Sequence, residues 1–169
     1  NNVSLTISSI DGLRAIQDSR SPTSLKLRRA GKIHELKIHL KLETGLNRQG
    51  ITEAELPELI NILTFSRMLE CCELEGIYSH FAVAELAHEE RYKKFCDAQM
   101  DKYERMIKMI EGAICKQVIK HMAGTAATIL MPRSRYDLVR VGIGMYGLDP
   151  TSDPSLPLIS GSRSRGEFP

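Results

Sequence analysis

The sequence predicts an α/β fold, namely a partial (β/α)8 TIM-type barrel with about five of the eight parallel strands. Three observations predict this class. Short runs that suit strands alternate with longer stretches whose apolar residues recur at helical spacing. Small residues follow the strand-like runs, as expected where a parallel strand gives way to a helix. The chain has 169 residues, whereas a complete barrel of this type needs about 250.

Five strand-like runs occur in order along the chain. We expect strands at residues 3–7, 36–42, 74–81, 115–121 and 136–141. In the second run, side chains alternate between two faces, with Ile38, Leu40 and Leu42 on one and Lys37, His39 and Lys41 on the other. A barrel strand tolerates this pattern when its polar face points into the barrel near the open end.

Helical stretches separate these runs. One short helix is expected after the first strand, a second at about 53–65, and a third from 84 to about 111. Thr52 and Glu55 form a capping-box pattern before the second helix. Pro57 marks either a kink or a later start of that helix.

Composition indicates a soluble globular domain. Hydrophobic residues make up 42% and charged residues 26%, and a net charge of +2 is too small to indicate a nucleic-acid or membrane partner. No apolar run approaches the roughly 18 residues of a membrane span. The four cysteines have neither metal-binding nor disulfide spacing, so we expect reduced thiols in a cytoplasmic protein without a metal.

The stretch from Lys41 to Gly50 joins the second strand to the second helix. Its glycines permit a tight path, and Arg48 can reach back over the strand ends. Ligands bind at this edge in α/β sheets and barrels. An ordinary charged surface turn has the same composition, so the stretch alone does not decide between a site and a turn.

Three motifs together resemble a known family. They read Lys41-x-Glu43-Thr44-Gly45-x-x-Arg48-x-Gly50, then Tyr78-Ser79-His80-Phe81-Ala82, then Val139-Arg140-x-Gly142-Ile143-x-x-Tyr146-Gly147. In this order and at about these spacings they resemble alanine racemase, over roughly residues 3–150. The resemblance makes 1–150 one barrel domain. Residues 151–169, rich in Pro, Ser, Gly and Arg, are expected to be a linker, a disordered tail or a remnant of cloning.

The resemblance implies an N-terminal barrel that binds pyridoxal 5′-phosphate, a β-rich C-terminal domain and a homodimer. Such an enzyme interconverts L- and D-alanine and supplies D-alanine for cell-wall peptidoglycan. Removal of the α-proton needs an electron sink, which the cofactor supplies, and inversion needs a base on each face. The family's Schiff-base lysine and catalytic tyrosine match no residue here. We therefore expect this chain to lack the first strands, the C-terminal domain and both catalytic residues, and to be inactive alone.

The cofactor-binding residues expected from the resemblance are Arg48, His80, His121, Thr125, Arg140, Gly142 and Ile143. Arg140 is expected to face the pyridine nitrogen and to keep it unprotonated, with His80 and His121 in the same hydrogen-bond network. Thr125 and the two backbone amides are expected to bind the phosphate. The alternative for Arg140 is a salt bridge at a strand end, and for His80 it is a structural histidine.

Arg48 and Lys41 have further roles in the resemblance. Arg48 is expected to contact the phenolic oxygen of the cofactor and to position the substrate carboxylate. Lys41 resembles a lysine that is often carbamylated, which would turn its cation into an anion that pairs with Arg48. A strand-end lysine would also suit a Schiff base, but the resemblance does not give Lys41 that role. The remaining alternative is an unmodified Lys41 paired with Glu43.

Two other functions stay open. The chain is also compatible with a non-catalytic pyridoxal-phosphate-binding barrel protein, or with a racemase of the same family that acts on serine. Alanine and serine differ by one hydroxyl group, and the residues of this chain do not decide between them.

Overall fold

The computed structural model describes residues 3–18, 36–65, 69 and 72–151. Residues 19–35, Cys71 and the expected tail from residue 152 onward lie outside the described residues. No helix in the described part is long and apolar enough to cross a membrane.

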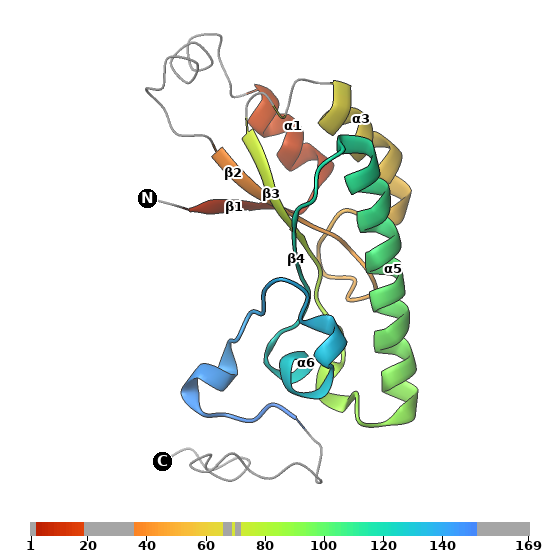
Figure 1. Ribbon diagram of the computed structural model, residues 1–169, viewed down its shortest axis with the longest axis vertical. Coiled ribbons are helices and arrows are strands. Elements are labelled where there is room, and N and C mark those ends of the chain that lie inside the picture. Colours follow the sequence, from red (N-terminus) through yellow and green to blue (C-terminus); the bar gives the residue numbers. More distant parts are fainter. Residues whose placement is uncertain (1–2, 19–35, 66–68, 70–71, 152–169) are drawn as a thin grey trace.

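Four parallel strands form one sheet in their sequence order (Figure 1). They are β1 (Ser4–Ile7), β2 (Leu36–Lys41), β3 (Cys72–Tyr78) and β4 (Ile119–His121). Each strand pairs in parallel with the next. The parallel sheet confirms the predicted fold class of a partial barrel, and all four strands end at the same edge.

The predicted fifth strand, at 136–141, is wrong, because the structure has no strand there. This segment still lies beside β4, since Asp137 N donates to Lys120 O (3.0 Å) and Arg140 N donates to Ala123 O (2.9 Å). However, the Asp137 carboxylate accepts from Lys120 N at 2.8 Å. A side chain therefore occupies the backbone donor that a further strand pairing would use. Tyr136 also has a φ of 46°, which interrupts an extended path.

Three helices cover one face of the sheet (Figure 1): α1 (Ile10–Asp18), α3 (Leu56–Phe65) and α5 (Glu90–Ile114). The capping box is confirmed, because Thr52 N donates to Glu55 Oε2 at 2.8 Å. A short 3-10 turn over Glu53–Glu55 precedes α3, so Pro57 lies in the first turn, where its missing N–H costs nothing. The alternative of a later helix start is thus confirmed.

The third helix and the strand after it are displaced from their predicted bounds. Residues 84–86 form a separate 3-10 turn, and α5 starts only at Glu90 and continues to Ile114. Cys115, with a left-handed φ of 52°, ends it, and β4 therefore starts four residues later, at Ile119. After β4 the chain enters a further helix, α6 (Thr125–Leu130).

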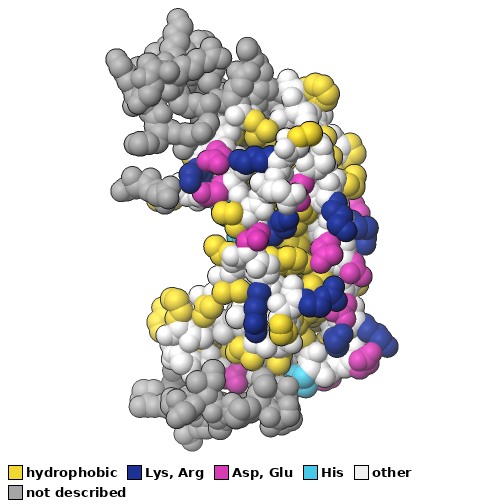
Figure 2. Space-filling view, viewed as in Figure 1, with side chains coloured by type: hydrophobic (Ala, Val, Ile, Leu, Met, Phe, Trp, Pro, Cys, Tyr) yellow, Lys and Arg dark blue, Asp and Glu magenta, His cyan; other side chains and the backbone are white. Residues whose placement is uncertain are grey.

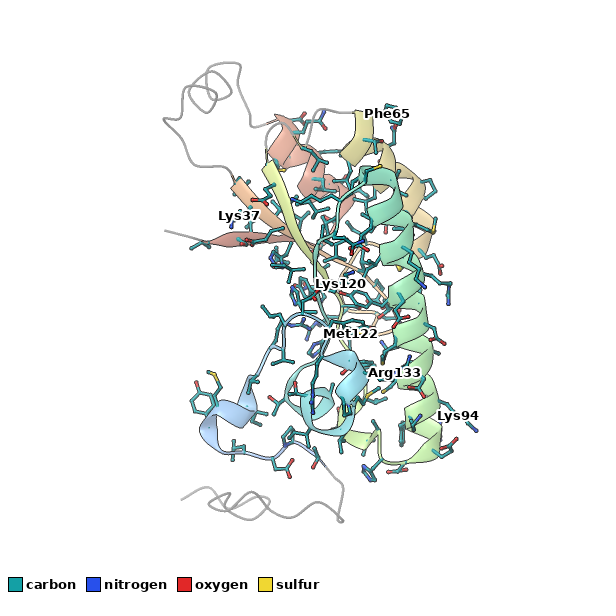
Figure 3. The ribbon with its side chains drawn as sticks, viewed as in Figure 1. Lys37, Phe65, Lys94, Lys120, Met122 and Arg133 are labelled. Carbon is teal, nitrogen blue, oxygen red and sulfur yellow. The ribbon has the colours of Figure 1, made fainter. Side chains whose placement is uncertain are left out.

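The sheet has two chemically different faces. The apolar face packs against the helices, and its fully buried side chains include Ile38, Leu40, Leu74 and Ile77. The polar face carries Lys37, His39, Glu75, Tyr78 and His121. Figure 3 shows Lys37 on the side of β2 away from α3 and α5. On the outside of the molecule, charged side chains gather over α5 (Figure 2).

Candidate functional site

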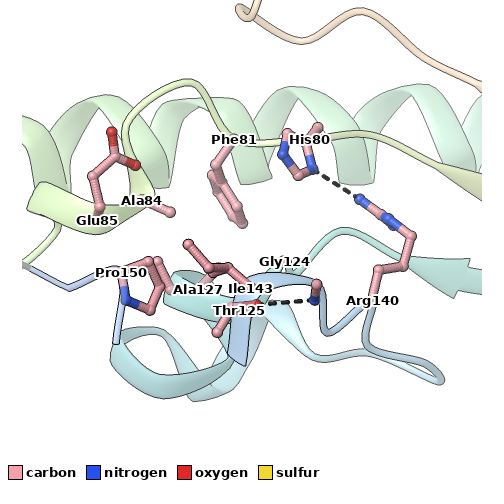
Figure 4. Close-up of a pocket in the computed structure, with 12 residues that line it drawn as sticks. His80, Phe81, Ala84, Glu85, Gly124, Thr125, Ala127, Arg140, Ile143 and Pro150 are labelled. Atoms are coloured by element: carbon pink, nitrogen blue, oxygen red, sulfur yellow. Dashed lines mark hydrogen bonds between the residues drawn. The ribbon is translucent and has the colours of Figure 1, made fainter. Parts of the chain in front are cut away.

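A pocket of about 260 Å³ opens at the edge where the strands end. It lies between the loop after β3, the start of α6 and the segment beside β4 (Figure 4). Its polar lining includes His80, Thr125 and Arg140, and Phe81 and Ile143 add apolar surface. Ligand sites in parallel α/β sheets occur at this carboxyl edge of the strands. Of the residues predicted from the sequence, the pocket brings together His80, Thr125, Arg140, Gly142 and Ile143.

Arg140 is held at one end of this pocket by the ends of β3 and β4. Its Nη1 lies 2.5 Å from His121 Nδ1 and 3.2 Å from His121 O. Its Nη2 donates to Ser79 O (2.6 Å) and Met122 O (3.1 Å), and lies 3.1 Å from His80 Nδ1. Within the described residues, Nε has no hydrogen-bond partner and Arg140 forms no ion pair. The alternative of a strand-end salt bridge is therefore wrong, because histidines and carbonyls hold this guanidinium.

Both histidines beside Arg140 are kept neutral. Burial lowers the pKa of His121 to about 3, and the Arg140 cation acts in the same direction. Burial also lowers the pKa of His80, again with a contribution from Arg140. The Tyr78 ring stacks on His121 with centroids 4.8 Å apart, and the Arg140 guanidinium lies 4.8 Å from the Tyr78 centroid. A cation thus remains beside neutral acceptors at this end of the pocket.

Thr125 forms a polar corner of the pocket. Its hydroxyl oxygen accepts hydrogen bonds from Gly142 N (3.0 Å) and Gly144 N (3.3 Å). A Cβ at Gly144 would lie 2.6 Å from the methyl carbon of Thr125, so only glycine permits this approach. Of the two amides predicted together with this hydroxyl, that of Gly142 donates to it, whereas the second donor is the amide of Gly144 and not that of Ile143.

Lys41 and Arg48 lie outside the pocket lining. Lys41 is 2% exposed, and its pKa is lowered, first by burial and then by the Arg48 cation. Among the described residues no ion pair joins Lys41 to Glu43, although the Glu43 charge still acts to raise the pKa of Lys41. The Glu43 carboxylate accepts from Gly45 N, and its buried Oε2 has no hydrogen-bond partner in the part of the chain that the structure describes. Arg48 is exposed, and its charge also lowers the pKa of His80.

Sequence reasoning missed Gln99, a buried side chain of α5. Its Oε1 accepts from Ala82 N (3.1 Å), and its Nε2 donates to His80 O (3.4 Å). A Cβ at Gly45 would lie 3.2 Å from its Nε2, so Gln99 also packs against the loop after β2. Gln99 thus supports two loops of the site from behind. The signal in the sequence is one uncharged polar residue beside the apolar positions of an amphipathic helix. The structure shows that this residue is 2% exposed.

Two hydroxyl groups join the same two loops. Ser79 Oγ donates to Leu42 O at 2.8 Å, and Thr44 Oγ1 lies 2.8 Å from Ser79 Oγ. Thr44 and Ser79 are both buried. The loops after β2 and β3 are therefore tied together beneath the site.

Comparison with known proteins identifies the family. The family model described as "Alanine racemase, N-terminal domain" matches residues 1–150. Alanine racemase 1 of Oceanobacillus iheyensis is 34% identical over 149 residues, covering 88% of this chain and 36% of that protein. Alanine racemase 2 of Caldanaerobacter subterraneus is 37% identical over 125 residues, covering 74% and 30%. The chain thus spans about a third of the length of these curated relatives.

A solved structure agrees with this match. The crystal structure of alanine racemase from D-cycloserine-producing Streptomyces lavendulae superposes with a TM-score of 0.72 at 26% identity. The superposition covers 89% of this chain and 36% of that one. With the family model matching most of its length, the chain belongs to the alanine racemase family, as part of the N-terminal domain.

Proposed function

We propose that this chain forms the pyridoxal-phosphate cradle of an alanine racemase, an isomerase that interconverts L- and D-alanine. The observation that carries the proposal is Arg140, a cation tied to carbonyls and neutral histidines at one end of the pocket. The family match supports it. A fold relative, the alanine racemase from Bartonella henselae, was solved with covalently bound pyridoxal phosphate (22% identity, TM-score 0.68).

The residues of the pocket fit this cofactor. Pyridoxal phosphate offers a ring nitrogen that accepts hydrogen bonds, an apolar ring face and a phosphate dianion. The pocket offers a guanidinium at one end, the apolar side chains of Phe81 and Ile143, and a corner made by Thr125 and the Gly142 amide. Glu85 also lines the pocket and would repel a dianion. The phosphate therefore belongs at the Thr125 corner and not beside Glu85.

Bound pyridoxal phosphate would supply an electron sink that makes the α-proton of an amino acid acidic enough to remove. Arg140 holds a donor toward the ring nitrogen and, since a guanidinium does not give up its proton, keeps that nitrogen unprotonated. His80 and His121 hold Arg140, and Thr125 with the amides of Gly142 and Ile143 binds the phosphate. In this proposal none of these residues moves the substrate proton, so the chain alone is inactive.

Arg48 and Lys41 complete the proposal on the substrate side. Arg48 positions the substrate carboxylate through charge-assisted hydrogen bonds. Lys41 is buried and its pKa is lowered, so a larger share of it is the free amine that reacts with carbon dioxide. The nitrogen adds to the carbon of carbon dioxide and releases one proton, leaving a carbamate anion. That anion would lie near the Arg48 cation, whose charge opposes an ammonium there.

Carbamylation can be tested by carbon NMR with ¹³C-labelled bicarbonate. We expect one slowly exchanging carbamate signal, which is lost in Lys41→Arg and kept in Lys116→Arg. Lys116 is the matched control because it is half-exposed and pairs with Glu73 far from the pocket. A signal that survives Lys41→Arg contradicts this assignment.

Cofactor binding is tested by absorbance titration of the chain with pyridoxal phosphate. Arg140→Gln removes a charge-assisted hydrogen bond, which corresponds to an affinity loss of about tenfold or more. Arg133→Gln, an exposed arginine outside the pocket, should leave the affinity unchanged. Circular dichroism of both variants controls for folding. Equal affinity of wild type and Arg140→Gln would refute the proposal.

Borohydride reduction then locates any covalent attachment. We expect no stoichiometric adduct on Lys41, because the proposal places the Schiff-base lysine elsewhere in the enzyme. A clean adduct on Lys41, mapped by mass spectrometry, would instead make Lys41 the Schiff-base residue.

The wider role proposed is that of a cytoplasmic homodimer that supplies D-alanine for peptidoglycan. Chiral chromatography after incubation of the enzyme with L-alanine and with L-serine tests the substrate.

A further inference from the structure

Four side chains on the polar face form a continuous hydrogen-bonded row, called the relay below. Arg140 Nη1 lies 2.5 Å from His121 Nδ1, and His121 Nε2 lies 2.8 Å from His39 Nδ1. His39 Nε2 in turn lies 3.1 Å from Glu75 Oε2. The relay therefore starts at the pocket and crosses β4 and β2 to end on β3. Sequence analysis placed His39 only on a polar strand face and did not single out Glu75.

Chemistry allows the relay only one direction. Arginine has donors and no acceptor, so His121 Nδ1 must accept from Arg140. A neutral His121 then carries its proton on Nε2 and donates it to His39 Nδ1. His39 likewise carries its proton on Nε2 and donates to Glu75, whose carboxylate only accepts. Each imidazole is thereby restricted to a single tautomer.

Local features of β3 build the far end of the relay. Between Ile38 and His39 the pairing partner changes from Leu74 to Gly76, so Glu75 is an extra, bulged residue on β3. A Cβ at Gly76 would lie 2.5 Å from the His39 ring, so glycine makes room for that imidazole. Such bulges re-aim side chains near functional sites.

Further partners fix the Glu75 carboxylate. Lys37 Nζ donates to Glu75 Oε1 at 2.6 Å, and the Ser4 hydroxyl donates to Oε2. These hydrogen bonds, with Lys37 first, lower the pKa of Glu75 to about 2. The acceptor that ends the relay therefore stays ionised across the physiological pH range.

We propose that Glu75 and His39 are positioning residues for the pocket. They hold His121 in the tautomer that accepts from Arg140, and so fix the guanidinium with its Nε–H available to a ligand's ring nitrogen. The ligand in this statement rests on the proposed function, whereas the relay itself does not. Neither residue lines the pocket, so both act through His121 and Arg140.

Nitrogen NMR of the histidine rings tests the relay without any ligand. In the ¹⁵N-labelled chain near neutral pH, we expect His39 and His121 each to show a protonated Nε2 and an unprotonated Nδ1. Glu75→Leu removes the terminal acceptor, so His39 should shift toward a mixture of tautomers, and His121, which then has only Arg140 to hold its tautomer, should shift in the same direction but less. Glu73→Leu is the matched control, since Glu73 lies on the same strand and pairs with Lys116, outside the relay. Glu75→Gln keeps an acceptor oxygen and should restore the wild-type tautomers.

Titration of the same variants with pyridoxal phosphate links the relay to the pocket. We expect about tenfold weaker binding for Glu75→Leu, wild-type binding for Glu73→Leu and partial recovery for Glu75→Gln. A wild-type His121 protonated on Nδ1 would overturn the proposal, even if the leucine variant did not fold. Unchanged tautomers and affinity in Glu75→Leu would also overturn it. Tautomers that shift as expected in a chain that binds no pyridoxal phosphate would support the relay and refute the proposed ligand.

Discussion

The two faces of the sheet are held by different kinds of interaction. On the apolar face, Ile38 and Leu40 are fully buried against helices. The stabilisation there is distributed over many non-directional packing contacts. On the polar face, His39 and Glu75 depend on a few hydrogen bonds, each with one donor and one acceptor. A change on the apolar face should therefore lower stability mainly in proportion to lost volume. A change on the polar face should alter the geometry of the site as well.

The largest expected loss of stability comes from a substitution on the apolar face. Leu40 is 0% exposed, so Leu40→Ala removes buried methyl groups and leaves a cavity, costing about 2–5 kcal/mol of unfolding free energy. Leu5→Ala is the matched control on the neighbouring strand, where the side chain is 46% exposed. Its cost should stay within about 0.5 kcal/mol. Urea unfolding measures both, and equal losses would mean that the helices do not shield this face.

The next largest effect is expected on the polar face, where the His39 ring lies against Gly76. In Gly76→Ala the new Cβ would meet the His39 ring at 2.5 Å, and displacing that ring costs about 1–3 kcal/mol. It should also separate His39 from His121, which the histidine NMR spectrum reports. Gly112→Ala on α5 is the control, because a Cβ there meets nothing within 4 Å. It should raise stability by about 0.5–1 kcal/mol. A Gly76→Ala chain as stable as wild type would show that the ring has free space.

A third prediction concerns Tyr103, which connects α5 to the strand ends. Its hydroxyl donates to Ile77 O (2.6 Å) and accepts from His121 N (3.1 Å), and the residue is 0% exposed. Tyr103→Phe removes both of these buried hydrogen bonds, each of which contributes about 0.5–1.5 kcal/mol, so the expected cost is about 1–3 kcal/mol. Tyr92→Phe, near the start of the same helix, should cost little. Thermal unfolding compares them, and equal midpoints would contradict the importance of this hydroxyl.

Much of this architecture could be predicted from local sequence. The alternation of Ile38 and Leu40 with Lys37 and His39 predicts the two faces because side chains alternate along a strand. The capping box at Thr52 is likewise local, since its partner is only three residues away. The prediction of a strand at 136–141 is wrong because the Asp137 side chain accepts the hydrogen bond of Lys120 N, a backbone donor of β4.

The candidate site could be predicted only in part. The family resemblance predicts His80, Thr125 and Arg140 as residues of one binding site, and the structure brings them together in one pocket. The support behind them was not predictable, because it depends on pairing register. The bulge that re-aims Glu75 is defined only by the partner strand. Gln99 lies on α5, 17 residues after its partner Ala82 in the sequence. Hydrophobic periodicity predicts only that such a position lies on the buried face of a helix, and not which loop it contacts.

The smallest expected effect, counted per pH unit, is the pH dependence of the unfolding free energy that His121 causes. It distinguishes the polar face of the sheet from the apolar face. His121 is 5% exposed, and burial, Arg140 and His39 lower its pKa from 6.5 to about 3, against an opposing contribution from Asp137. Between these values the unfolded chain binds a proton at His121 that the folded chain does not. Stability is therefore fully present above about pH 6.5 and falls as the pH decreases, by up to about 1.4 kcal/mol per pH unit.

The pH window separates His121 from Glu75. Because the pKa of Glu75 is lowered from 4.5 to about 2, its contribution is present above about pH 4.5 and is lost only below it. Urea unfolding between about pH 7.5 and 5.5 thus isolates the histidine effect, to which His80 adds with the same sign because its pKa is also lowered. His121→Gln should flatten the pH dependence, whereas Leu40→Ala should lower stability equally at every pH. Parallel slopes for wild type and His121→Gln would show that His121 is not buried as a neutral residue, and the relay would then lose its central member.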